Sequence, residues 1–239
     1  MSLPADFTDK LRVPLIAAPM FLVSGPDLVI ATCRAGAIGS FPTANCRTLE
    51  DLDEWLGRMV AETKGAAPFA PNLIVHKSNA RLQEDAAMVA EHKAPLVIAS
   101  VGSPAPVMDT IHEYGGRVFA DIASMRHAEK AIATGVDGLI LLTAGAGGQT
   151  GWANPFAFVR AVREIFDGPV VLSGGISDGV ALKAAITLGC DLAYMGTRFI
   201  ATQESMAVEG YKDMLVSSSL DDVMLSSAFT GLPASKLRP

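Results

Sequence analysis

Three glycine-bearing segments have the residue types and spacing that bind an anionic ligand. Two of them, Ser173-Gly174-Gly175 and Met195-Gly196-Thr197, each follow a short apolar run, and the third is the segment 144–151 with the sequence AGAGGQTG. Glycine lets backbone N–H groups approach a phosphate closely, because no Cβ stands in the way. We expect the first two segments to bind a phosphate and the third to lie against the rest of the ligand. The alternatives are tight turns for the first two and a ligand-free flexible loop for the third.

Several other candidate residues stand at or near the ends of apolar runs. Asn72 either binds a ligand or caps a loop, and Asp121 either faces a ligand or caps the helix that follows it. Met20 either contacts a ligand or belongs to the core. Among the histidines, only His76 stands at the end of such a run, where it is a weak candidate for a base or a solvated loop residue. The other three are expected to be surface or packing residues in or near helices: His92, His112 and His127.

The elements that must position these residues alternate between short apolar runs and stretches of helical period. The runs are continuously apolar, as in strands that are buried on both faces. The eight expected strands are Pro14–Ala18, Ala37–Ser40, Phe69–Val75, Leu96–Ser100, Arg117–Ile122, Gly138–Thr143, Pro169–Ser173 and Leu192–Met195. The seven clear helices expected between them are Pro26–Ala35, Thr48–Lys64, Asn79–His92, Pro104–Tyr114, Met125–Thr134, Pro155–Phe166 and Asp178–Leu188, and a weaker eighth is expected from about Thr202. Helix C-caps are expected at Gly135, Gly168 and Gly189.

This alternation predicts the fold class. Consecutive β-then-α units pair in parallel with right-handed crossovers, and eight of them in about this length form a closed barrel. We therefore predict an α/β fold, a (β/α)8 TIM barrel over residues 1–201, with an atypical C-terminal segment over residues 202–239. The rival is an open doubly wound sheet, which often has GxGxxG after its first strand; that motif is absent here. In a barrel the carboxyl ends of the strands form the site, so the residues above are expected to meet there.

Composition excludes several classes of protein. The 239 residues include 19 Lys and Arg against 25 Asp and Glu, a formal net charge of −6, and 50% of them are apolar, so neither a disordered chain nor a nucleic-acid-binding surface is expected. The sequence has no run of about 18 apolar residues that would predict a membrane span. The three cysteines are widely spaced and form no CxxC motif, which argues against a zinc site or a disulfide framework and favours the cytoplasm.

Four motifs in order give the sequence a family resemblance. They are Leu15-Ile16-Ala17-Ala18-Pro19-Met20, the stretch Gly145–Gly151, Leu172-Ser173-Gly174-Gly175-Ile176 and Ala193–Phe199 with the sequence AYMGTRF. With these motifs the sequence resembles the nitronate monooxygenase family, formerly called 2-nitropropane dioxygenase, which includes related NADH:quinone reductases. The resemblance runs nearly end to end and includes Phe229-Thr230-Gly231-Leu232-Pro233. It also implies that segment 202–239 is incomplete relative to the family, whose members usually continue into further helices.

The resemblance implies that FMN binds at the barrel mouth. The phosphate would lie on Gly174, Gly175, Gly196 and Thr197, with Ser173 and Met195 beside them. The ring would lie over Ala18, Pro19 and Met20. Residues expected around the ring are Asn72, Ser100, Asp121, Gly147 and Gly148. The implied partners are small molecules, either a nitronate with O2 or NAD(P)H with a quinone, and a homodimer is the assembly considered.

One residue departs from the family pattern. Nitroalkane-oxidising members typically have histidine in the glycine loop, as GGHxG, and Gln149 stands at that position here. Histidine can accept a proton from carbon next to a nitro group, whereas an amide side chain has no useful basicity. We therefore expect neutral nitroalkanes to be poor substrates, while nitronate anions, which need no deprotonation, still react. Gln149 would then orient a substrate oxygen.

Other functions stay open at this stage. Hydride transfer from NAD(P)H to a flavin depends on geometry more than on a base, so an NAD(P)H:quinone reductase is the closest alternative. An enoyl-thioester reductase of similar barrel type is a further option without a selecting feature. A flavin-binding barrel without catalytic activity is an alternative of another class. A further alternative is an isomerase or aldolase that uses a bare phosphate site, and it predicts a colourless protein.

Overall fold

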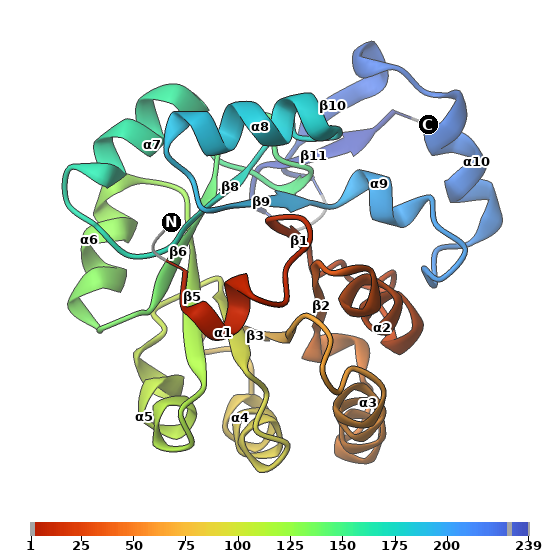
Figure 1. Ribbon diagram of the computed structural model, residues 1–239. Coiled ribbons are helices and arrows are strands. Elements are labelled where there is room, and N and C mark those ends of the chain that lie inside the picture. The colour runs from red at the N-terminus through yellow and green to blue at the C-terminus, as the bar shows by residue number, and fades with distance from the viewer. Residues whose placement is uncertain (1–2, 229–230, 239) are drawn as a thin grey trace.

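The computed structural model describes residues 3–228 and 231–238, and its centre is a closed parallel barrel (Figure 1). The barrel strands are β1 (Leu15–Ala17), β2 (Ile38–Pro42), β3 (Phe69–Ile74), β4 (Leu96–Ser100), β5 (Arg117–Ile122), β6 (Gly138–Leu142), β8 (Val170–Ser173) and β9 (Leu192–Met195). Each strand pairs in parallel with its neighbour, and β1 closes the ring by pairing with β9. The predicted TIM barrel is therefore confirmed, with all eight predicted strands present.

Helices surround the barrel in the predicted order. They are α2 (Pro26–Ala35), α3 (Leu49–Glu62), α4 (Leu82–Glu91), α5 (Ala105–Glu113), α6 (Met125–Ala133), α7 (Pro155–Arg163) and α8 (Gly179–Leu188). Gly189 caps α8 in the left-handed conformation, as predicted. The prediction for Gly168 was wrong, because α7 already ends at Arg163. The weak last helix was also misplaced, because α9 (Thr197–Ile200) and α10 (Glu209–Ser217) lie on either side of Thr202.

Two apolar layers hold the barrel together. The interior contains inward-facing strand residues, which stand two positions apart where a strand supplies two, as Leu96 and Ile98 do, and the outer layer lies between strands and helices. A short helix that was not predicted, α1 (Ala5–Thr8), adds the buried side chain of Phe7 to the inner layer. The guanidinium group of Arg117 stacks 4.8 Å from the centre of the Phe7 ring. The opposite end, where the strands terminate, stays available for a ligand.

The C-terminal part of the chain pairs with the glycine loop. Strands β10 (Val223–Ser226) and β11 (Ala234–Leu237) form an antiparallel sheet with β7 (Gly148–Gln149), a strand that was not predicted. Gln149 is opposite Ala234, and the amide of Thr150 donates to the carbonyl of Pro233 at 3.2 Å. The glycine loop is therefore held by the chain terminus. Phe229 and Thr230 of the terminal motif lie outside the described residues.

No helix in the described part of the chain is long and apolar enough to cross a membrane.

Candidate active site

A chain of polar side chains faces the interior at the carboxyl ends of β3, β4 and β5. Asn72, Ser100 and Asp121 each follow an inner-core residue by two positions, so the alternation of a strand turns them inward. The side-chain Nδ2 of Asn72 donates to Ser100 Oγ at 2.7 Å and to the backbone carbonyl of Ile98 at 3.0 Å. Ser100 Oγ in turn donates to Asp121 Oδ2 at 2.5 Å. Three residues predicted separately thus form one hydrogen-bonded row.

Asp121 is the unusual member of this row. Its Oδ1 atom is buried and has no hydrogen-bond partner among the described residues. Burial raises the pKa of this carboxyl to about 7, against a smaller lowering by the Ser100 hydrogen bond. Asp121 does not cap the following helix, because the side chain of Ser124 accepts the bond from the His127 amide. That alternative for Asp121 was therefore wrong.

A second buried polar atom lacks a partner at the same level of the barrel. The hydroxyl of Tyr194, on β9, is buried without a hydrogen-bond partner within the described chain. Burial and the charge of Asp121 both raise the pKa of this phenol well above its ordinary value, so Tyr194 stays protonated. Tyr194 was not predicted as a site residue, although its inward position two residues after Leu192 could have indicated it.

The three glycine segments meet at the mouth. Gly174 and Gly175 have positive φ angles of 129° and 68°, and the amide of Gly175 donates to the carbonyl of Gly145 at 3.2 Å. Arg198 Nε of α9 donates to the carbonyl of Ser177 at 2.8 Å, which joins the turn after β9 to the turn after β8. A Cβ added at Gly147 would lie 3.7 Å from Thr197 Oγ1. The predicted juxtaposition of these segments is present.

The turn after β1 completes the rim. The amide of Ala18 donates to the carbonyl of Met195 at 2.8 Å, and Pro19 and Met20 follow, half-buried. The sulfur of Met20 lies 3.5 Å from where a Cβ at Gly196 would be, so Met20 sits beside the predicted phosphate turn. The Asn45 amide group donates to the carbonyls of Met20 and Ser24 at 3.1 and 2.8 Å. Asn45, which was not predicted as a site residue, therefore positions this turn.

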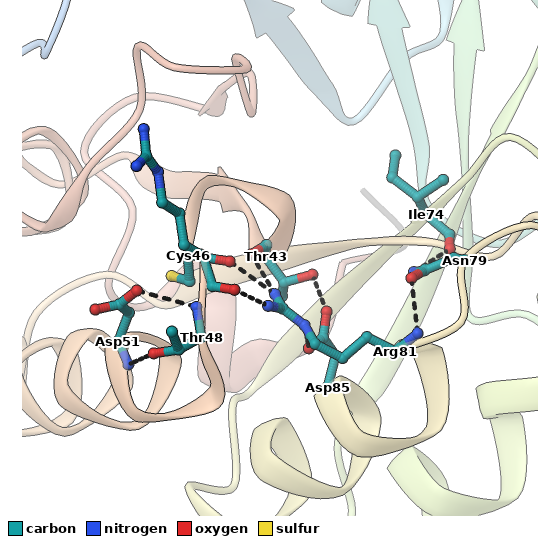
Figure 2. A network of polar contacts seen from close by, with 9 residues as sticks. Thr43, Cys46, Thr48, Asp51, Ile74, Asn79, Arg81 and Asp85 are labelled. Carbon is teal, nitrogen blue, oxygen red and sulfur yellow. Dashed lines mark hydrogen bonds and ion pairs between the residues drawn. The ribbon is translucent and has the colours of Figure 1, made fainter.

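A polar network binds the residues on either side of Asn45 (Figure 2). Arg81, just before α4, forms an ion pair of 2.7 Å with the buried carboxylate of Asp85. The same guanidinium group donates to the carbonyls of Thr43, Cys46 and Arg47, which flank Asn45. Thr43 Oγ1 donates to the second carboxylate oxygen of Asp85 at 2.8 Å. This network fixes the loop after β2 and, through it, the turn that carries Met20.

A cavity of about 800 Å³ opens beside the polar row. Asp121 and Gln149 lie in its wall, together with apolar residues such as Leu142 and Pro233. His127 and Lys130 of α6 also line it. His127 is exposed, as predicted. That it lines this cavity was not predicted, because a position on a helix does not show which cavity the side chain borders. His76 is elsewhere: it hydrogen-bonds Ser78 Oγ at 2.7 Å in an exposed loop, outside this cavity lining.

Together the fold and the site define a TIM barrel whose strand ends bring three glycine segments and a row of buried polar side chains to one mouth. The nitronate monooxygenase family model matches residues 80–238, and the chain belongs to this family. The predicted resemblance is confirmed.

Individual relatives agree with this assignment. The chain is 29% identical to a nitronate monooxygenase of Paraburkholderia phytofirmans, over 91% of this chain and 71% of the relative. It is 28% identical to a hydroxy-methyl-oxo-octahydroindene-carboxyl-CoA dehydrogenase of Rhodococcus jostii, over 92% of this chain but only 61% of the relative. Among solved structures, FabK from Thermotoga maritima superposes with a TM-score of 0.87 at 29% identity, over 99% of this chain and 75% of that one. A nitroalkane oxidase of Streptomyces ansochromogenes superposes with a TM-score of 0.87 at 26% identity, over 96% and 78%.

Proposed function

We propose that the chain is an FMN-dependent oxidoreductase that oxidises alkyl nitronates with O2. The single observation that carries this proposal is the convergence of three glycine segments on the rim beside a row of buried polar side chains. Membership of the nitronate monooxygenase family supports the same reaction class. The three cysteines are free thiols, as is usual in the cytoplasm, where we place the protein.

The residues present fit a flavin phosphate. A Cβ added at Gly175 would meet nothing within 4 Å, so the turn after β8 faces open space. Gly174 is closed to a side chain, because a Cβ there would lie 2.4 Å from Thr143 Oγ1. Such a turn presents backbone rather than side chains to its ligand, as phosphate-binding turns do. The phosphate would be held by Ser173, Gly174, Gly175, Met195, Gly196 and Thr197.

The remaining rim residues would hold the ring. The ring would lie over the turn of Ala18, Pro19 and Met20. Asn45 fixes this turn through its hydrogen bonds to the carbonyls of Met20 and Ser24. Asn72 would accept from a donor on its polar edge through Oδ1, because its side-chain N–H groups already bind Ser100 and Ile98, and the backbone of Gly147 and Gly148 would lie beside it. The chemistry that bound FMN would supply there is electron transfer from the nitronate to O2. Gln149 can hold a substrate oxygen through its amide but cannot accept a carbon-bound proton, which is why we propose a nitronate anion as the substrate.

The purified protein is expected to be yellow, or to become so with added FMN, and to consume O2 when propyl-2-nitronate is added. The measurements are an absorbance spectrum and an oxygen-electrode trace. A preparation that stays colourless in excess FMN would contradict the proposal at the cofactor. Bound flavin without oxidase or reductase turnover would instead support the catalytically inactive barrel.

Gln149 also favours a second candidate, an NAD(P)H:quinone reductase at the same site. Hydride transfer between a nicotinamide and a flavin needs alignment and no protein base, so the loss of the family histidine leaves this reaction intact. Mixing the FMN-loaded protein with NADH under nitrogen separates the candidates. Rapid bleaching of the flavin, followed by recovery on adding benzoquinone, would favour the reductase.

Replacing Gln149 tests the role of the loop position. We expect Gln149→His to raise turnover of neutral 2-nitropropane by about 100-fold, because general-base catalysis typically contributes 10²-fold or more. Turnover of preformed propyl-2-nitronate should change little, since that substrate is already deprotonated. Gln149→Asn is the control, because it keeps an amide and adds no base. An unchanged rate on the neutral nitroalkane would count against a lost base.

A further inference from the structure

Asp121 differs from its hydrogen-bonded neighbours in having an unused oxygen. Asn72 and Ser100 use their donors within the row, whereas Asp121 accepts one bond at Oδ2 and leaves Oδ1 buried without a partner among the described residues. An ionised carboxylate buried with one hydrogen bond is costly, and a neutral carboxyl is much less so. The protonated form also supplies a donor that the site otherwise lacks at this point.

The surroundings of Asp121 favour an anionic ligand. Asp121 lines the cavity of about 800 Å³ together with Gln149, whose amide can donate to an oxygen. His127 and Lys130 of α6 line the same cavity and are the cationic or titratable groups on that side. Across the barrel, the titratable group facing Asp121 is Tyr194 of β9, which stays neutral. The other lining residues are mostly apolar, such as Ile122 and Leu142.

We propose that Asp121 binds the substrate in its protonated form and donates a hydrogen bond from its carboxyl group to a substrate oxygen that carries negative charge. This inference rests on the proposed function and names its substrate class: a small anion whose charged oxygens adjoin an apolar group, as in an alkyl nitronate. It moves Asp121 from the cofactor, where the family resemblance placed it, to the substrate. The protonated carboxyl is neutral while the substrate is bound, so it does not repel the negative charge of the substrate.

The sign of the pH dependence follows from this role. Burial raises the pKa of Asp121 to about 7, so the donor is present below pH 7 and lost above it. Ionisation removes a hydrogen bond and adds a repulsive charge, so binding of an anion should weaken as the pH rises through 7 and approach a tenfold loss per pH unit well above it. The hydrogen bond from Ser100 lowers the pKa of Asp121. Removing this bond should therefore raise that pKa and shift the fall in affinity to higher pH.

Isobutyrate is a suitable probe, because it matches the shape and charge of propyl-2-nitronate and does not react. We would titrate it into the FMN-loaded protein from pH 6 to pH 9 and follow the flavin absorbance. Wild type should bind it about tenfold more weakly at pH 8 than at pH 6. Asp121→Asn keeps a neutral donor and should bind it with little change across this range. Asp121→Leu has no donor and should bind it roughly tenfold more weakly than wild type at pH 6.

Infrared difference spectra of the same proteins supply a readout that does not depend on binding. Wild type should show a protonated carboxyl band at pH 6 that is lost by pH 8, and both Asp121 variants should lack it. The proposal is overturned if wild-type affinity does not change with pH, or if Asp121→Asn shows the same fall as wild type.

These results are separable from the proposed function. If isobutyrate binding follows the predicted pattern while propyl-2-nitronate is not oxidised, the role of Asp121 stands and nitronate oxidation fails. If the nitronate is oxidised while isobutyrate binding is independent of pH, nitronate oxidation stands and the role of Asp121 fails.

Discussion

Gly175→Asp is expected to weaken FMN binding by about 100-fold, equivalent to about 2.7 kcal/mol. Gly175 has a φ of 68°, a left-handed conformation that Asp and Asn adopt more readily than other side chains, and a Cβ there meets open space. The substitution therefore places a carboxylate at the proposed phosphate position without a clash. Titrating the flavin-free protein with FMN and following the fluorescence of the flavin measures the change.

The matched control is Gly175→Asn, which has the same size and backbone preference but no charge. It should weaken FMN binding far less than Gly175→Asp does. Riboflavin, which has no phosphate, should bind the two variants equally. Equal FMN affinity of the Asp and Asn variants would show that no phosphate lies at this turn.

Arg81→Met should lower the free energy of unfolding by about 3–5 kcal/mol, the usual cost of leaving a buried carboxylate unpaired. The side chain of Asp85 is 3% exposed, and Arg81 is its ion-pair partner and also binds three backbone carbonyls of the loop after β2 (Figure 2). The loss of these contacts also frees Asn45 and the turn that carries Met20. Urea unfolding followed by circular dichroism measures the stability.

Arg34→Met is the control for this prediction. Arg34 forms an ion pair with Glu62 in which the two side chains are 57% and 36% exposed, so its loss should cost less than about 1 kcal/mol. In Arg81→Met/Asp85→Asn the unpaired charge is gone, and part of the lost stability should return. If Arg81→Met costs no more than Arg34→Met, the network does not stabilise this loop.

The sequence by itself determined the barrel and the order of its elements. Strands such as Leu96–Ser100 and helices such as Pro26–Ala35 have the predicted bounds, because burial on both faces or on one helical face leaves a local periodicity. It also placed Asn72, Ser100 and Asp121 at strand ends, and hence at one end of the barrel. The family motifs could also be identified from the sequence, because each is a short contiguous segment.

Only the tertiary structure decided which of these residues interact. Gln149 pairs with Ala234, 85 positions later, and two exposed glycine-loop residues have no periodicity that predicts a strand. Arg81 binds the loop that holds Asn45, and Asn45 holds the turn after β1, three segments whose sequences carry no mutual signal. The unpartnered oxygen of Asp121 depends on the surrounding strands and not on its neighbours in sequence. Hydrophobic periodicity records whether a residue is buried, whereas hydrogen-bond partners and unmet donors depend on where distant segments are brought together.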